Sequence, residues 1–408
     1  MHKYIFKNSS YLLLSQLLVK AFAFGYAIFL AGNIGASDFG TYSAALSIFG
    51  LMSLFADLGI NRVLTRDIAR DSANLGKLFS TALLLRAFST SVSFFGLTLF
   101  FFLADPSHLR FSLTSIALLS LVPQSIALSV DAVLIALRKA PISALSFFLF
   151  NMVNYILGAV LIFLGFGVYG AIIAFLLCHI FYAVFIVISL GFVTKIEFKP
   201  FDLKLARSIL IKSLPYGILS AIGFASFRLD TVILSFSRTG AETGIYSLAY
   251  RFLEAATIVP VAFGTVLYPL FSQHSGNANK TSMLFRNSVF FGLGAGTFVT
   301  LVYLTILPLF LETFFPESFI GSARALQILS FAIPFIFMHV PLAQLLLSRE
   351  ELLKQVLLIY LFVFGINLAL MLAFIPKFGF IAAAWITVIT EVMTYVTFLV
   401  FIKKKVLL

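Results

Sequence analysis

The feature that most constrains this chain is a series of twelve long apolar stretches that carry very few charges. They lie at residues 10–31, 41–60, 78–103, 111–137, 141–164, 168–193, 210–235, 244–271, 285–310, 322–347, 352–375 and 379–402. A helix of about 20 apolar residues, rising about 1.5 Å per residue, spans the hydrocarbon core of a bilayer. Only 11% of the residues are charged, against about 25% in soluble domains. The sequence therefore predicts an all-α integral membrane protein with about twelve transmembrane helices.

The second half of the chain repeats features of the first half. Residues 40–43, Gly-Thr-Tyr-Ser, return as Gly-Ile-Tyr-Ser at 244–247, and both copies open an apolar stretch. Further pairs recur in the same order at offsets of 211 or 212 residues: Pro123 with Pro334, Arg138 with Arg349, Gly167 with Gly379, and Ala171 with Ala383. Repeated halves are common in transporters, whose sites often lie between the repeats. We therefore expect two repeated six-helix bundles around a central cavity, at 1–193 and 213–408.

A basic, amphipathic linker at 194–212 joins the two predicted bundles, and we expect it to lie along the cytoplasmic membrane surface. Most other loop cations fall on the same side. With twelve spans both termini share a side, which carries 20 Lys and Arg residues, whereas the opposite side carries 4. Cytoplasmic loops are enriched in Lys and Arg. Membrane topology thus explains the net charge of +12 without nucleic-acid binding, and it predicts that both termini are cytoplasmic.

Two stretches of the chain resemble a known family. The sequence FGTYS at 39–43, followed by DLGINRVLTRDIARD at 57–71, is similar to the start of bacterial polysaccharide flippases. LDTVILSFSRTGAETGIYSLAYRF at 229–252 is similar to the start of their second half. These flippases belong to the multidrug/oligosaccharidyl-lipid/polysaccharide exporter superfamily. The resemblance implies two six-helix bundles facing a central cavity, alternating access, and location in the bacterial cytoplasmic (inner) membrane.

Four cations lie inside predicted spans: Lys20, Arg86, Arg228 and Arg251. A charge in the middle of a bilayer costs at least about 2.5–3.5 kcal/mol, so such residues normally face a protein interior or water. Lys20 shares a helix face with the small residues Ala23 and Ala27, as in a cavity wall. Arg86 lies nearer the cytoplasmic end, where its side chain can also reach the interface. We predict that the four cations form a cationic cavity that binds an anionic substrate.

Five acidic residues lie within or at the ends of the spans: Asp57, Asp131, Asp230, Glu254 and Glu391. Asp57 and Asp131 are close to cytoplasmic ends, and solvation there explains them. Glu254 follows Arg251 by three residues, so it either neutralises this arginine or leaves it to a ligand. Glu391 has no neighbouring cation on its own helix, and it is either a proton carrier or a neutral, hydrogen-bonded group. Glu391, Glu254 and Asp230 are therefore the candidate ion-coupling residues.

Motifs of enzymes and cofactor sites are scarce in this sequence. Gly292, Gly294 and Gly296 form a GxGxG within the ninth predicted span, but a nucleotide-binding loop needs a preceding strand. We interpret Gly292 and Gly296 as sites of close helix packing. The single cysteine, Cys178, excludes a disulfide framework and a cysteine metal site. We expect no cofactor, no metal and no enzymatic activity.

A cationic interior and the resemblance lead to the same hypothesis. The chain is predicted to be a flippase that translocates polyprenyl-diphosphate-linked oligosaccharide repeat units for O-antigen, capsule or exopolysaccharide. Its expected partners are this lipid-linked substrate, membrane lipids and, in biosynthesis, polysaccharide polymerase and glycosyltransferases.

A multidrug exporter or a lipid II flippase of the same superfamily is the alternative. Multidrug exporters commonly carry an acid in the first helix, where this chain has Lys20, and lipid II flippases usually have fourteen helices. A membrane-embedded polymerase or ligase needs a large external loop that this chain lacks.

Overall fold

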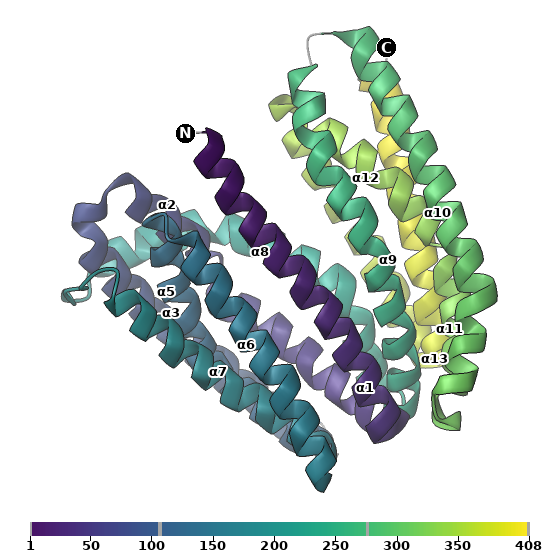
Figure 1. Ribbon diagram of the computed structural model, residues 1–408, viewed down its shortest axis with the longest axis horizontal. Helices are drawn as coiled ribbons and strands as arrows, with labels where there is room; N and C mark the ends of the chain where they lie inside the picture. The colour runs from purple at the N-terminus through teal and green to yellow at the C-terminus, as the bar shows by residue number, and fades with distance from the viewer. Residues whose placement is uncertain (1, 105–107, 275–276, 406–408) are drawn as a thin grey trace. The chain divides into compact units, whose positions relative to one another are not determined.

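A computed structural model describes residues 2–104, 108–274 and 277–405, and its ordered segments in this part of the chain are helices (Figure 1). The helices of the first half are α1 His2–Asp57, α2 Ile60–Arg70, η1 Ser72–Asn74, α3 Leu75–Ala104, α4 His108–Leu119, α5 Leu121–Ala136, α6 Ala140–Leu161, η2 Ile162–Phe166 and α7 Gly167–Gly191. Those of the second half are α8 Leu203–Ser237, α9 Gly240–Gln273, α10 Ala278–Phe314, η3 Glu317–Phe319, α11 Ile320–Ser330, α12 Ile333–Leu347, η4 Glu350–Leu352 and α13 Leu353–Lys405. The predicted all-α membrane fold is confirmed.

The number of spanning helices depends on how broken helices are counted. Within the described residues, eight continuous helical stretches are long and apolar enough to cross a membrane, or nine if the bent pair α11–α12 is one span. Three of the eight contain a non-helical glycine: α1 at Gly35, the α6–α7 stretch at Gly165, and α13 at Gly379. Dividing these three stretches at their breaks and counting the bent pair α11–α12 as one span gives the twelve spans that the sequence predicts.

Two of the repeated glycines lie at equivalent breaks. Gly167 has φ 53° and ψ −141°, and Gly379 has φ 63° and ψ −144°. A side chain with a Cβ is strained in this region, and glycine is not. Both glycines therefore allow one apolar helix to end and the next to begin without a loop, which is the physical reason for their recurrence in the sequence.

The chain divides into two compact units. The N-unit comprises Met1–Asn33 and Thr41–Leu229, and the C-unit comprises Ile34–Gly40 and Asp230–Leu408. The N-unit thus includes the first part of α8, and the C-unit includes a short piece of α1. The predicted bundle boundaries at 193 and 213 remain a prediction. The predicted linker is irregular only up to Asp202, because α8 already begins at Leu203.

The N-unit is built around α5 and α7. Figure 1 shows α6 alongside α7, and α2, α3 and α5 also pack together. The amphipathic helix α2 buries Ile60, Val63, Leu64 and Ile68 in this core. At the turn before α2, Gly59 has φ 79° and lies against Gly217 of α8. A Cβ on Gly217 would lie 2.7 Å from the carbonyl oxygen of Leu58, so a close backbone crossing holds α8 in the N-unit.

A second close crossing lies in the C-unit and involves both copies of the repeated tetrapeptide. Gly40 lies against Gly244, where an added Cβ would meet the Gly244 nitrogen at 2.5 Å, and Gly244 lies against the carbonyl of Ala36. The backbone N–H of Ala36 also donates to Ser318 Oγ at 3.4 Å, and the ring of Phe39 packs edge-on against Phe319. The repeated glycines are therefore packing sites.

The glycines of α10 pack as the sequence predicts. A Cβ on Gly292 would lie 2.5 Å from the carbonyl oxygen of Phe337, and one on Gly296 would lie 2.8 Å from Pro334 Cα. Nothing lies within 4 Å of the corresponding position at Gly294. Gly292 and Gly296 let α10 approach α12 closely, whereas Gly294 points away from this contact.

We expect Gly292→Ala and Gly296→Ala each to lower the free energy of unfolding by about 1–3 kcal/mol, because the added methyl group overpacks a backbone contact. Gly294→Ala is the matched control and should be neutral or slightly stabilising, since alanine favours the helix. Thermal unfolding of the purified variants in detergent measures the difference. Equal losses at all three positions would contradict the packing role.

Candidate functional site

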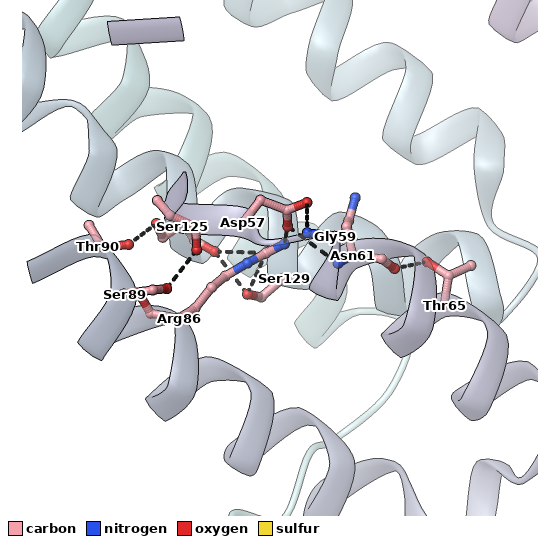
Figure 2. Close-up of polar contacts among 10 residues, drawn as sticks. Asp57, Gly59, Asn61, Thr65, Arg86, Ser89, Thr90, Ser125 and Ser129 are labelled. Atoms are coloured by element: carbon pink, nitrogen blue, oxygen red, sulfur yellow. Dashed lines mark hydrogen bonds and ion pairs between the residues drawn. The ribbon is translucent and has the colours of Figure 1, made fainter. Parts of the chain in front are cut away.

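A buried arginine organises the polar interior of the N-unit (Figure 2). Arg86 lies on α3 with 1% of its side chain exposed, and its guanidinium forms an ion pair with Asp57 at the end of α1. The same guanidinium donates to Ser129 Oγ at 2.9 Å and to the Ser125 carbonyl at 3.3 Å, both on α5. One side chain therefore joins three helices.

The carboxylate of Asp57 has a second role at the α1–α2 turn. It accepts the backbone N–H groups of Gly59 and Asn61 at 3.2 and 3.3 Å, which satisfies donors at the start of α2 (Figure 2). Leu58 adopts φ 48° in this turn, which is unusual for a residue with a Cβ. The sequence predicted only solvation for Asp57, whereas the structure shows a cap combined with an ion pair.

Hydroxyl groups complete the surroundings of Arg86. Ser89 Oγ donates to the Ala56 carbonyl at 2.7 Å, and Thr90 and Ser125 exchange a hydrogen bond at 2.6 Å. An arginine in hydrocarbon is tolerated when it is paired and hydrogen-bonded. In this conformation Arg86 holds helices of the N-unit together. Its contact with substrate remains a prediction, and such a contact would require Arg86 to leave these partners.

Two further predicted cations belong to the N-unit. Lys20 lies on α1 with an exposed side chain, and Arg228 is half-buried on α8. Both residues are within hydrophobic helices that are long enough to span a membrane. Their assignment to substrate binding stays a prediction.

Asp230 is buried in the C-unit and is held by its neighbours. It accepts a short hydrogen bond from the hydroxyl of Tyr246, and the backbone N–H of Thr231 donates to it at 2.6 Å. Tyr246 Oη also lies 3.3 Å from Thr387 Oγ1 on α13. Tyr246 is the tyrosine of the repeated tetrapeptide, and its contact with Asp230 links α8, α9 and α13.

Arg251 and Glu254 form an ion pair on α9, one of the two alternatives that their spacing left open. The Nη1 of Arg251 lies 3.0 Å from Glu254 Oε2, with 22% and 28% of the two side chains exposed. Both groups thus retain surface that other partners can reach. The pair agrees with mutual neutralisation, and the ligand role of Arg251 remains a prediction.

Glu391 has a partner on a neighbouring helix. His339 Nδ1 of α12 lies 3.2 Å from Glu391 Oε2 of α13, and both side chains are largely buried. The distance between the two atoms is that of an ion pair, but their geometry is not that of a hydrogen bond. Sequence reasoning missed His339, since only helix packing brings the two residues together. The ion-coupling role of Glu391 remains a prediction.

Known families and structures share this architecture. Residues 5–275 match the family model described as "Polysaccharide biosynthesis protein". A structure of the lipid II flippase MurJ in an inward closed conformation has a TM-score of 0.80 at 18% identity, covering 96% of this chain and 87% of that one.

An inward-facing multidrug resistance MATE family transporter of the MOP superfamily has a TM-score of 0.71 at 18% identity, covering 93% of this chain and 94% of that one. A MOP superfamily transporter from Pyrococcus furiosus, with a binding pocket of reverse polarity, gives 0.62 at 16% identity and covers 99% of this chain and 95% of that one. No curated protein sequence matches the chain significantly. At these identities the structural likeness shows the fold.

We expect Arg86→Met to lower the free energy of unfolding by about 3 kcal/mol, because it leaves the Asp57 carboxylate half-buried without its cation. Arg70→Met is the control, since Arg70 is exposed at the end of α2 and a surface change costs about 0.5 kcal/mol or less. Adding Asp57→Asn to Arg86→Met should recover part of the loss. Thermal unfolding in detergent measures these differences in stability. Equal stability of Arg86→Met and Arg70→Met would refute the role of the network.

If the His339–Glu391 pair carries a coupling proton, Glu391→Gln should abolish the dependence of transport on a pH gradient while the protein still inserts normally. His339→Gln should weaken that dependence as well, because the pair shares the proton site. Transport by membrane vesicles with and without an imposed pH gradient measures this. A wild-type pH dependence in Glu391→Gln would leave the pair a structural role only.

Proposed function

This chain belongs to the polysaccharide biosynthesis protein family, and we propose that it is a flippase for polyprenyl-diphosphate-linked oligosaccharides. It moves repeat units of O-antigen, capsule or exopolysaccharide from the cytoplasmic to the outer leaflet by alternating access. The observation that carries the proposal is the presence of cations within spanning helices of both units. Lys20 and Arg228 lie in the N-unit, and Arg251 lies in the C-unit.

The chemistry of the substrate fits these cations. A diphosphate diester carries about two negative charges, and its sugars cannot cross hydrocarbon unaided, whereas its lipid tail stays in the bilayer. Lysine and arginine bind phosphate oxygens through charge-assisted hydrogen bonds. Arginine makes a forked, bidentate contact that lysine cannot make. Binding and release of this substrate by rocking of helices involve no covalent chemistry. The proposed function therefore needs no catalytic residue.

The alternative substrates differ in charge. Multidrug exporters usually transport cationic substrates. An interior that contains Lys20, Arg228 and Arg251 is unfavourable for such substrates. Lipid II is itself a lipid-linked diphosphate sugar, so a lipid II flippase needs similar cations. Functional complementation separates these alternatives: the chain should restore surface glycan in a strain lacking its glycan flippase, and it should not restore growth after depletion of the lipid II flippase.

Topology follows the distribution of basic loop residues. We place the chain in the cytoplasmic (inner) membrane with both termini cytoplasmic, close to the glycosyltransferases and polymerase that handle the same glycan. Reporter fusions after Asn74, Lys199 and Lys280 are expected to report cytoplasm, and one near Glu317 is expected to report the outside. The predicted fusion near Asp105 lies outside the described residues. A fusion at Lys280 that reports the outside would overturn the arrangement.

Substitutions at Arg251 test the proposed ligand role. Arg251→Ala should abolish surface glycan, and Arg251→Lys should weaken it, because lysine keeps the charge and loses the fork. Lys20→Arg should be tolerated, since it keeps a cation. The expected loss for each charge-assisted contact is about tenfold to a hundredfold in affinity. Surface glycan, normalised to protein in the membrane, is the measurement.

The ion pair with Glu254 supplies the control. If Arg251 only neutralises Glu254, then Arg251→Ala combined with Glu254→Ala should restore transport. If Arg251 binds the diphosphate, the double variant should stay as inactive as Arg251→Ala alone. Full activity of the double variant at normal protein levels would remove Arg251 from the proposed site and leave the site to Lys20 and Arg228.

A further inference from the structure

A basic cleft lies at the ends of three membrane helices of the N-unit. Its volume is about 810 Å³, and it opens where α3 and α8 begin and where the irregular segment after α7 passes between them. The lining residues come from two segments, 72–77 and 194–204. A second cleft of about 400 Å³ shares Asn74 and Lys77 and adds the cations Arg70 and Lys212 and the acids Asp67 and Asp71. Polar and basic groups therefore concentrate at this end of the N-unit.

The irregular segment that forms one wall is held in place. The backbone N–H of Lys199 donates to Ser80 Oγ at 3.1 Å, and the ring of Phe198 packs edge-on against Phe79 at 6.0 Å between centroids. Gly76 lies so close to the carbonyl of Glu197 that a Cβ would collide with it. The cleft is thus preformed by backbone and side-chain contacts.

The charges of the cleft do not balance. Lys77 is paired with Asp202 at 2.8 Å, and Lys199 is paired with Glu197 at 3.0 Å. The hydrogen bonds from Lys77 and from the backbone N–H of Leu205 lower the pKa of Asp202, so this carboxylate stays ionised near neutral pH. The remaining lining cations are Lys195 and Lys204, both exposed. They give the cleft an excess of two positive charges.

The rim of the cleft is apolar although it is exposed. Phe201 and Leu203, which line the cleft, are 47% and 74% exposed. Large apolar residues beside lysines at the ends of spanning helices are typical of the membrane–water interface. This composition suits the depth of lipid headgroups, with apolar side chains at the edge of the cleft that can contact acyl chains.

We propose that this cleft binds the phosphate headgroup of an anionic phospholipid, with Lys195 and Lys204 as its cationic contacts. The two uncompensated lysines match the charge of a phosphodiester, and the volume is within the range of about 300–1,000 Å³ that is usual for small-molecule sites. The exposed Phe201 and Leu203 would lie among the acyl chains of the same lipid. The inference does not depend on which substrate the protein transports.

Lipid titration of the purified full-length protein, followed by native mass spectrometry, tests the proposal. Wild-type protein should retain phosphatidylglycerol in preference to phosphatidylcholine. Each lysine near an anionic headgroup contributes about fivefold to affinity, so Lys195→Gln with Lys204→Gln should weaken the tightest phosphatidylglycerol site about 25-fold. Lys280→Gln with Lys354→Gln is the matched control, because both are exposed lysines that do not line the cleft. Lys195→Arg with Lys204→Arg should bind like wild type.

Amine labelling of wild-type protein in nanodiscs gives a second readout that needs no variant. Phosphatidylglycerol should protect Lys195 and Lys204 from acylation at least fivefold relative to phosphatidylcholine, with Lys280 as the internal reference. Unchanged binding in the Lys195→Gln, Lys204→Gln protein, or equal labelling in both lipids, would overturn the proposal. Protection by a lipid-linked diphosphate or an acidic peptide, with none by phosphatidylglycerol, would overturn it too.

Discussion

The backbone polar groups that enter the membrane must be hydrogen-bonded within the protein, and the helical structure follows from this constraint. Hydrocarbon offers no hydrogen bonds, so the spanning backbone is helical. Where helices end without a loop, glycine supplies the required dihedral angles, as at Gly167 and Gly379. Hydroxyl side chains within spans bond back to the preceding turn, as Ser47 does to the Ser43 carbonyl. Buried charges are paired within the protein in the same way, as Arg86 is with Asp57.

Two close glycine crossings bring distant segments together, and one of them involves the repeat. Gly40 and Gly244 stand at equivalent places in the two copies of the tetrapeptide, and in the C-unit they pack against each other. Gly59 and Gly217 form the second crossing, in the N-unit. Helices that approach through bare backbone are held by many short contacts, which replace the hydrophobic driving force that is absent between helices in lipid. These glycines thereby fix which segments belong to each unit.

Sequence reasoning succeeded where the signal is local or periodic. Apolar length predicted the spans, and the spacing of Gly292 and Gly296 predicted helix packing. The three-residue offset offered the pair of Arg251 and Glu254 as one of two alternatives. The helix α2 was missed as a helix, although the spacing of Ile60, Val63, Leu64 and Ile68 is the pattern of an amphipathic helix.

Contacts between distant segments could not be predicted. Arg86 meets Asp57 and α5 only after three helices have packed, and His339 meets Glu391 only across α12 and α13. A single sequence gives no register between helices, so the partners of a buried charge remain unknown until the fold is seen. The sequence therefore predicted Arg86 as a cavity residue, whereas in this conformation Arg86 is buried and paired with Asp57.

The central claim is that the chain moves lipid-linked glycans between leaflets, and reconstitution tests it most directly. The purified protein would be placed in liposomes that carry a polyprenyl-diphosphate oligosaccharide in one leaflet, and the glycan reaching the other leaflet would be measured with an impermeant glycosidase. The account predicts transfer that is much faster than in protein-free liposomes. Transfer at the protein-free rate, from a folded protein that does transport an organic cation, would contradict it.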